Sequence, residues 1–126
     1  MLLKIEATAK TPKLKVNPEK GLIQLSGISI PEDPRAFYAP FQEAVDAYVA
    51  APREKTLVEF KLEYFNTSTT LILRNLLRKL NTLQNRTDLQ IKWYYEEDDE
   101  DMSEVGAELK LLCPGIDFEI IEVQQF

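Results

Sequence analysis

Four consecutive hydroxyl-bearing side chains, residues 67–70 with the sequence Thr-Ser-Thr-Thr, are the group in this chain best placed to do chemistry. They follow Asn66 and precede an apolar-rich stretch that begins at Leu71. Side-chain oxygens of Asn, Ser and Thr accept hydrogen bonds from the free N–H groups of a first helical turn, so helix capping is one explanation. A cap needs one residue, and Asn66 or Thr67 would serve. The other hydroxyls leave a second explanation open, which is a phosphorylation switch.

A phosphate on one of these hydroxyls would add about −1.5 to −2 charge and three acceptor oxygens. A helix N-terminus tolerates such a group, with a contribution of about 0.3–1 kcal/mol. The first cation along the predicted helix is Arg74, and no arginine cluster adjoins Thr67 in the sequence. We therefore expect phosphorylation to change the surface charge and the choice of partner, without a large internal rearrangement.

The other chemically capable residues make weaker sets. The chain has no histidine, which is the commonest general base, and its four glycines are scattered and form no phosphate-binding loop. The single cysteine, Cys113, precedes a proline, and we interpret it as a packing residue. We therefore expect no enzymatic activity and no cofactor.

An acidic run occupies residues 96–101. Its carboxylates could bind a hard cation such as Mg²⁺, but acidic side chains also favour solvent and helix N-termini. We interpret the run as the solvated start of a helix, with Val105, Leu109 and Leu112 facing inward, and expect no metal site. Tyr94, just before the run, is expected on the wetter face of a strand, where it could contribute to a binding surface.

Hydrophobic periodicity predicts the elements that position these residues. Alternation of period two predicts strands, and apolar residues at helical spacing predict helices. The predicted strands lie at 3–7, 13–16, 22–30, 56–65, 89–93 and 118–121. The predicted helices are residues 34–50, a helix of about 17 residues that follows Asn66, and a helix that the acidic run opens. Their order is β-β-β-α-β-α-β-α-β.

The pattern also predicts how the elements pack. Alternating strands and helices in the second half predict parallel strands with right-handed crossovers, while the opening strands predict an antiparallel edge. In strand 56–65, Val58, Phe60, Leu62 and Tyr64 alternate with charged residues, which predicts that only one sheet face is buried. The sequence therefore predicts an α/β fold in a single domain, residues 1–126, with a mixed sheet of about six strands and helices mainly on one face.

Composition limits the possible functions. The chain has 126 residues, 44% of them hydrophobic, and a net charge of −6, which suits one compact domain and argues against binding to nucleic acid or to an anionic membrane. One cysteine permits no internal disulfide. Neither a secretory signal nor an apolar run of roughly 20 residues is visible, so we expect a cytoplasmic protein.

Several short motifs together resemble a known family. They are Ala7-x-x-x-Thr11-Pro12, Tyr64-Phe65-Asn66-Thr67-Ser68-Thr69, Trp93-x-Tyr95-Glu96, Glu104-x-Gly106-x-Glu108 and Phe118-x-Ile120. This set is similar to the SiaC family of bacterial regulatory phosphoproteins over nearly the whole chain. The Asn-Thr-Ser and Trp-x-Tyr-acidic steps are its more specific parts.

The resemblance implies a switch residue. SiaC proteins are similar in fold and logic to the STAS domains of anti-anti-sigma factors, in which an Asp-Ser-x-Gly step starts a helix and its serine is phosphorylated. Asn66-Thr67 match the Asp-Ser positions, and Thr69 stands where that pattern has glycine. By resemblance, Thr67 is the phosphorylated residue, with Ser68 as the fallback. We predict that Asn66, Ser68, Thr69 and Tyr94 contribute to partner binding.

The resemblance also implies partners: a histidine-kinase-like serine/threonine kinase, a PP2C-type phosphatase, and a diguanylate cyclase activated by the unphosphorylated form. Such a circuit would link the chain to cyclic-di-GMP signalling and biofilm formation. The resulting hypothesis is a non-catalytic regulatory phosphoprotein. The alternative hypothesis is a small-molecule-binding STAS-like domain, with its cleft between the helix layer and the sheet edge; a closed apolar pocket with a few convergent polar groups would favour it.

Overall fold

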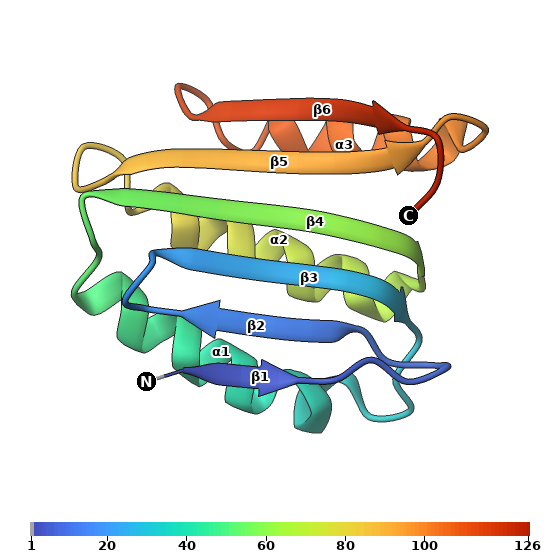
Figure 1. Cartoon of the computed structure of the whole chain (residues 1–126), viewed down its shortest axis with the longest axis horizontal. Helices are drawn as coiled ribbons and strands as arrows, with labels where there is room; N and C mark the ends of the chain where they lie inside the picture. The colour runs from blue at the N-terminus through green and yellow to red at the C-terminus, as the bar shows by residue number, and fades with distance from the viewer. Residues whose placement is uncertain (1) are drawn as a thin grey trace.

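The fold consists of one mixed β-sheet and three helices (Figure 1), seen in a computed structural model that describes residues 2–126. The elements in chain order are β1 (Leu3–Ile5), β2 (Lys13–Asn17), β3 (Leu22–Ser29), α1 (Pro34–Ala50), β4 (Lys55–Phe65), α2 (Thr67–Asn81), β5 (Asp88–Glu96), α3 (Glu100–Lys110) and β6 (Asp117–Val123). This confirms the predicted order of strands and helices.

The strands lie side by side in the same order as they occur in the chain, β1-β2-β3-β4-β5-β6. β1, β2 and β3 pair antiparallel, whereas β3 to β6 pair parallel. The predicted antiparallel edge and parallel half are therefore both present. The parallel strands all end at the same edge of the sheet, so the segments that follow them are neighbours there.

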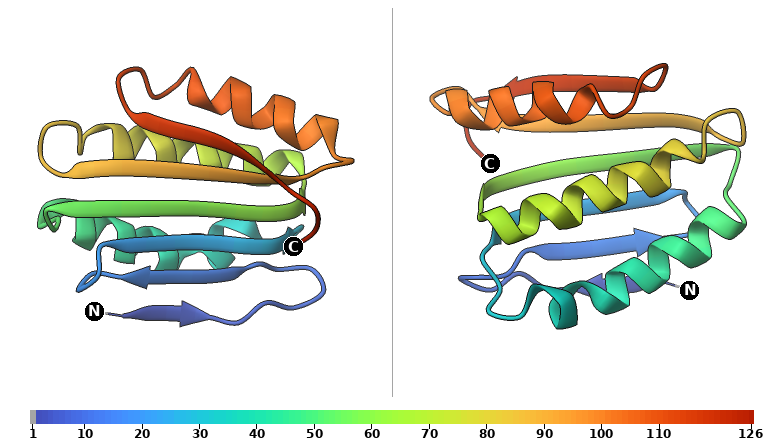
Figure 2. Two further views of the ribbon diagram at one scale, coloured as in Figure 1. Left: turned by 45° about the horizontal axis from the view of Figure 1, so that its top comes forward. Right: turned by 180° about the vertical axis from the view of Figure 1, so that it is seen from behind.

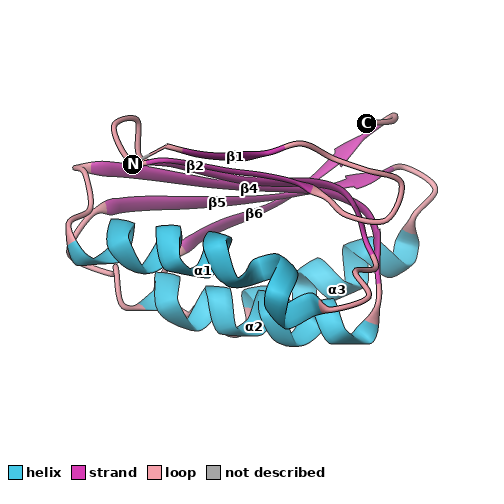
Figure 3. Ribbon diagram, turned by 90° about the horizontal axis from the view of Figure 1, so that it is seen from below, coloured by secondary structure: helices cyan, strands magenta, loops and turns pink. Residues whose placement is uncertain are grey.

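All three helices cover the same face of the sheet, and the opposite face is left open (Figure 3; Figure 2, right). The hydrophobic core lies between the sheet and the helix layer, and its largest fully buried side chains include Trp93, Tyr38, Phe41 and Phe60. Cys113 is also buried, as expected for a packing residue. The prediction that helices lie mainly on one face is confirmed.

Strand β4 follows its predicted alternation only as far as Leu62. Val58, Phe60 and Leu62 are buried, but Tyr64 is 58% exposed, so its predicted inward orientation was wrong. The cause is an irregularity in pairing: Leu62 lies opposite Gly27 and Tyr64 opposite Ile28, which leaves Glu63 as an extra residue. A bulge of this kind interrupts the two-residue period of a strand.

The acidic run opens helix α3, as predicted. The Asp99 side chain accepts a hydrogen bond from the Met102 backbone N–H at 3.0 Å and caps the helix. Leu109 is buried, but Leu112 is 37% exposed, so its predicted inward position was wrong. The reason is that α3 ends at Lys110, and the helical period no longer orients the side chains beyond it.

Candidate functional site

The four hydroxyls lie where β4 ends and α2 begins, at the edge of the sheet where the parallel strands finish (Figure 1). Asn66 is the N-cap of α2 and Thr67 is its first residue. The Asn66 side-chain oxygen, Oδ1, accepts hydrogen bonds from the Thr69 N–H at 3.2 Å, the Thr69 hydroxyl at 3.1 Å and the Ser68 hydroxyl at 2.8 Å. Asn66 therefore does the capping.

The Thr67 side chain is exposed. Among residues 2–126, none donates a side-chain hydrogen bond to the Thr67 hydroxyl or accepts one from it. The two explanations left open by the sequence, a cap and a modifiable hydroxyl, thus belong to different residues. Asn66 forms the cap, and Thr67 presents its hydroxyl to solvent.

Thr69 is fully buried and joins three elements. Its hydroxyl has one hydrogen to donate, with Asn66 Oδ1 and the Ser29 carbonyl oxygen both 3.1 Å away as acceptors. The same hydroxyl lies 2.8 Å from the Ser29 hydroxyl, which in turn lies 2.6 Å from the Tyr38 hydroxyl. The start of α2 is thereby tied to the end of β3 and to α1. Burial raises the pKa of Tyr38, while its hydrogen bonds with Ser29 and Thr69 act in the opposite direction. Thr69 can shape the site only from inside.

Thr67 lines an open hollow of about 300 Å³ at this edge. Its walls are Glu63, Tyr64, Phe65, Asn66, Thr67, Thr70, Asp99, Asp101, Met102 and Val105. Within the described chain, no lysine or arginine lines this hollow, whereas three carboxylates do. A phosphate on Thr67 would therefore enter an acidic environment.

A second hollow of about 170 Å³ continues from the first between α2 and α3. Thr70 and Val105 line both, and Arg74 lines only the second. Two large apolar side chains are exposed beside Thr67: Tyr64, and Leu71 at 66% exposure, one helical turn further along α2. Exposed aromatic and aliphatic side chains at a polar rim are typical of protein–protein contact sites.

The structure does not bring all the predicted residues together. Asn66 and Ser68 lie beside Thr67, and Thr69 lies beneath it, but Tyr94 does not line the hollow at Thr67. Tyr94 lies on the open face of the sheet, as predicted, and its hydroxyl donates to Glu59 Oε2 at 3.0 Å. Burial, and then the Glu59 carboxylate, raise the pKa of Tyr94.

Residues that sequence reasoning missed include Asp99 and Asp101, which follow β5. A signal for them existed: β4 and β5 were predicted to be parallel neighbours, and the loops after parallel neighbours meet at one edge. The acidic run could thus have been placed beside Thr67. Tyr64 carried no comparable signal, because its exposure depends on the bulge.

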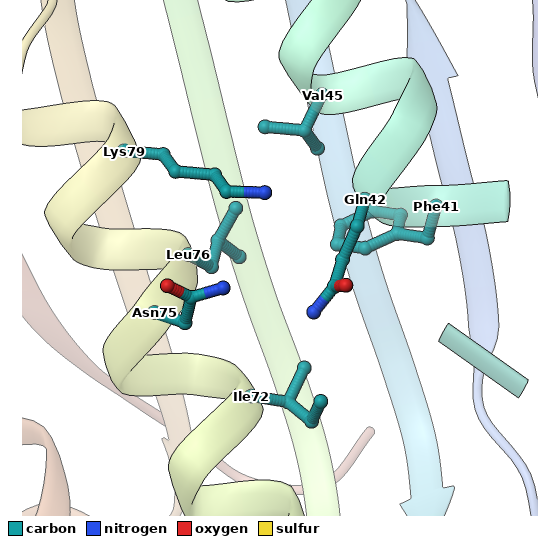
Figure 4. A pocket seen from close by; sticks show the side chains of 7 residues that line it. All are labelled: Phe41, Gln42, Val45, Ile72, Asn75, Leu76 and Lys79. Atoms are coloured by element: carbon teal, nitrogen blue, oxygen red, sulfur yellow. The ribbon is translucent and has the colours of Figure 1, made fainter. Parts of the chain in front are cut away.

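The alternative is a small-molecule site between the helix layer and the sheet edge, and two hollows lie in that region. A groove of about 390 Å³ lies between α1 and β1. The Tyr48 hydroxyl on its wall is already hydrogen-bonded to the Thr56 hydroxyl at 2.6 Å, so Glu43 is the polar side chain that remains for a ligand. Between α1 and α2, the space shown in Figure 4 is only about 10 Å³, enough for about one water molecule. Neither is a closed pocket with convergent polar groups.

No metal-binding arrangement of three or more Cys, Asp or Glu side chains occurs in residues 2–126. Across the same residues, no helix has the length and apolar character required to cross a membrane.

The chain is a small α/β domain with a capped helix start and an exposed threonine at the carboxyl edge of its parallel strands, which is where open α/β sheets place their binding sites. The family comparison adds a regulatory role. The model of the SiaC family of regulatory phosphoproteins matches residues 5–123, and the chain belongs to that family.

Individual relatives are distant in sequence but close in structure. An uncharacterized protein of Pseudomonas aeruginosa (strain UCBPP-PA14) is 23% identical over 112 residues, covering 88% of this chain and 89% of the relative. The crystal structure of apo-SiaC from Pseudomonas aeruginosa is 22% identical, with a TM-score of 0.86 over 96% of this chain and 98% of that one. SiaC in complex with the diguanylate cyclase SiaD, which it activates, is 23% identical, with a TM-score of 0.89 over 96% and 99% of the two chains.

Proposed function

We propose that this chain is a non-catalytic, cytoplasmic regulatory phosphoprotein whose switch is Thr67. A histidine-kinase-like serine/threonine kinase would phosphorylate it, a PP2C-type phosphatase would reverse the modification, and a diguanylate cyclase would be its effector. The observation that supports the proposal most directly is that different residues at the start of α2 cap the helix and present a free hydroxyl. Asn66 satisfies the cap, so the exposed Thr67 hydroxyl can be modified without loss of the helix.

Ser68 is the less accessible alternative. Its hydroxyl donates to Asn66 Oδ1 at 2.8 Å and its side chain is half-buried. Phosphorylation there would break a hydrogen bond of the cap, with a cost of about 0.5–1.5 kcal/mol. Thr67 has no such bond to lose, which supports its choice over Ser68.

The acidic walls of the hollow suggest how the switch acts. A phosphate on Thr67 would share the hollow with Glu63, Asp99 and Asp101, and no cation on the walls would neutralise it. It would occupy the space beside Tyr64 and raise the cost of dehydrating this surface. A partner that covers Tyr64 and Leu71 would therefore bind the unmodified form and be released by the phosphate.

The identity of the effector rests on family membership and on what is stated of a relative: SiaC of Pseudomonas aeruginosa is an activator of the diguanylate cyclase SiaD. By analogy, the unphosphorylated chain would bind and activate the corresponding cyclase of its own genome. Control of that enzyme would place the chain in cyclic-di-GMP signalling and in the regulation of biofilm formation.

The modification is tested by co-expressing the chain with the kinase of its own genome and measuring intact mass. We expect a mass gain of one phosphoryl group in the wild type and in Thr70→Ala, and none in Thr67→Ala. A gain that persists in Thr67→Ala and disappears in Ser68→Ala would transfer the switch to Ser68. The absence of any gain in the wild type would reject the phosphoprotein proposal.

The effector is tested separately with purified cyclase. Thr67→Val keeps the branched shape of the side chain and should bind the cyclase as the wild type does. The phosphorylated wild type should bind it at least tenfold more weakly, measured by calorimetry. Equal affinity of the two forms would show that Thr67 does not control this partner.

A further inference from the structure

The open face of the sheet carries a group of lysines that is unusual in a chain with a net charge of −6. Lys4 lies directly opposite Lys15 in the pairing of β1 with β2, and like charges in this position destabilise a sheet. Lys13 and Lys61 lie on the same face. In residues 2–126, none of these four lysines has a carboxylate oxygen within 4.0 Å of its ammonium nitrogen, whereas Lys79 pairs with Asp46 at 2.9 Å.

Lys13 and Lys61 flank a hydroxyl. Lys13 pairs with Ser26, and Ser26 pairs with Lys61, so the three side chains form a row across β2, β3 and β4. Neighbouring strands are about 4.8 Å apart, which separates the two lysine Cα atoms by about 10 Å. Both ammonium groups can therefore reach one anion held above the Ser26 hydroxyl.

A hollow of about 520 Å³ lies over this row. Lys13, Ser26 and Lys61 line it together with Tyr94, Val123 and Phe126. Lys61 Nζ lies 5.0 Å from the centre of the Tyr94 ring, and the hydrogen bond to Glu59 holds that ring in place. The hollow thus has a cationic side and an aromatic, apolar side, and its volume is in the range that accommodates a small ligand.

We propose that this hollow binds a small phosphate ester of mononucleotide size. The phosphate would lie between Lys13 and Lys61, and the planar organic group beside Tyr94 and Phe126. Glu63, which also lines the hollow, would accept a hydrogen bond from a hydroxyl or amino group of the ligand. The site is independent of the Thr67 switch, although Glu63 borders both hollows and places them side by side.

The test uses the whole chain and calorimetric titration with GMP, AMP and inorganic phosphate at low salt. We expect saturable binding of one nucleotide per chain, tighter than that of phosphate alone. Lys13→Ala and Lys61→Ala should each weaken it about tenfold, the loss of one charge-assisted hydrogen bond. Lys92→Ala is the matched control, since Lys92 is on the same face but does not line the hollow.

Amide chemical-shift mapping supplies a second measurement, with nucleotide-induced shifts expected at Ser26, Gly27 and Tyr94. The proposal is overturned if no nucleotide saturates, if Lys92→Ala weakens binding as much as the other two variants, or if the shifts gather elsewhere. It is also overturned if phosphate binds as tightly as the nucleotides. Binding of hexaglutamate or of anionic lipid vesicles in place of nucleotides would instead identify an acidic protein segment or a membrane as the occupant.

Discussion

At the scale of single residues, a hydroxyl side chain can either hydrogen-bond within the protein or remain available to a partner. At the start of α2, different residues take these two roles. Thr67 faces solvent, while Thr69 is buried against Ser29 and Tyr38. Two threonines of identical chemistry thus differ in what they can do because a helical turn orients them differently.

Thr69→Val should test the buried network. Valine keeps the shape of the side chain but removes the buried hydroxyl that bonds with Ser29 and Asn66, so the free energy of unfolding should fall by about 1–3 kcal/mol. Urea unfolding followed by the fluorescence of Trp93, the single tryptophan, measures the change. Thr70→Val, the same substitution at the next residue, should change stability by less than about 0.5 kcal/mol. Equal losses in the two variants would contradict the importance of the network.

The pKa of Tyr38 gives the network a signature in alkaline solution. Because burial raises this pKa above its ordinary value near 10, the folded state favours the neutral phenol. Its contribution to stability is therefore complete below pH 10 and is lost as the pH rises toward the folded-state pKa. Urea unfolding from pH 8 to 11 should show this fall in the wild type and in Tyr64→Phe. The fall should be shallower in Tyr38→Phe, and an unchanged slope there would exclude Tyr38 as its source.

At the scale of elements, the packing of α3 on β5 depends on one glycine. A Cβ at Gly106 would lie 2.5 Å from Cδ1 of Trp93, whose indole N–H donates to the Met102 carbonyl at 2.9 Å. The helix approaches the sheet closely enough that hydrogen is the only side chain that fits beside the ring. This contact fixes the helix that carries Asp101 to the wall of the hollow at Thr67.

Gly106→Ala should therefore destabilise the protein, although alanine favours helices by about 1 kcal/mol over glycine. We expect the steric conflict with Trp93 to prevail and to cost about 1–3 kcal/mol, with an altered Trp93 emission spectrum. Glu104→Ala, on the exposed side of the same helix, should stay within about 0.5 kcal/mol of the wild type. A more stable Gly106→Ala protein would show that the helix can shift away from the ring at little cost.

The elements also show how far sequence reasoning reaches. Periodicity and turn residues predicted a helix at roughly 34–50, where the structure has Pro34–Ala50, and the order of all the elements, because these depend on neighbours in the chain. The exposure of Tyr64 and Leu112 could not be predicted in the same way. It depends on a bulge between two strands and on where a helix stops against its surroundings. For the site, the sequence pattern led to Asn66 and Thr67. It did not lead to Asp99 and Asp101 on the facing wall, because these lie in a different segment, between β5 and β6.

At the scale of the whole molecule, charge is unevenly distributed. Acidic side chains surround Thr67 and the start of α3, while lysines gather on the open sheet face. The carboxylates at the start of α3 repel one another, and each like-charge pair on neighbouring positions of a helix lowers stability by about 0.2–0.5 kcal/mol. The acidic region is thus suited to a positively charged partner, and the lysine-bearing face to a negatively charged one.

Salt should stabilise the protein through the acidic end, because added ions screen this repulsion. We expect the urea midpoint to rise between 10 and 300 mM NaCl. The double variant Glu97→Gln/Asp98→Asn, which removes two exposed carboxylates, should show a smaller rise. A rise of the same size in both proteins would mean that the repulsion lies elsewhere.

The sheet order, in which every strand lies beside its predecessor in the chain, has a consequence for how the protein is made. Each strand that leaves the ribosome finds the edge it needs already formed, so no later segment must be inserted between earlier ones. Every pairing closes a short loop or a single crossover, which keeps the entropic cost of each step low. β6 joins last of the six strands and completes the wall of the hollow that Lys13 and Lys61 line, so that site forms only after the other five strands have been made.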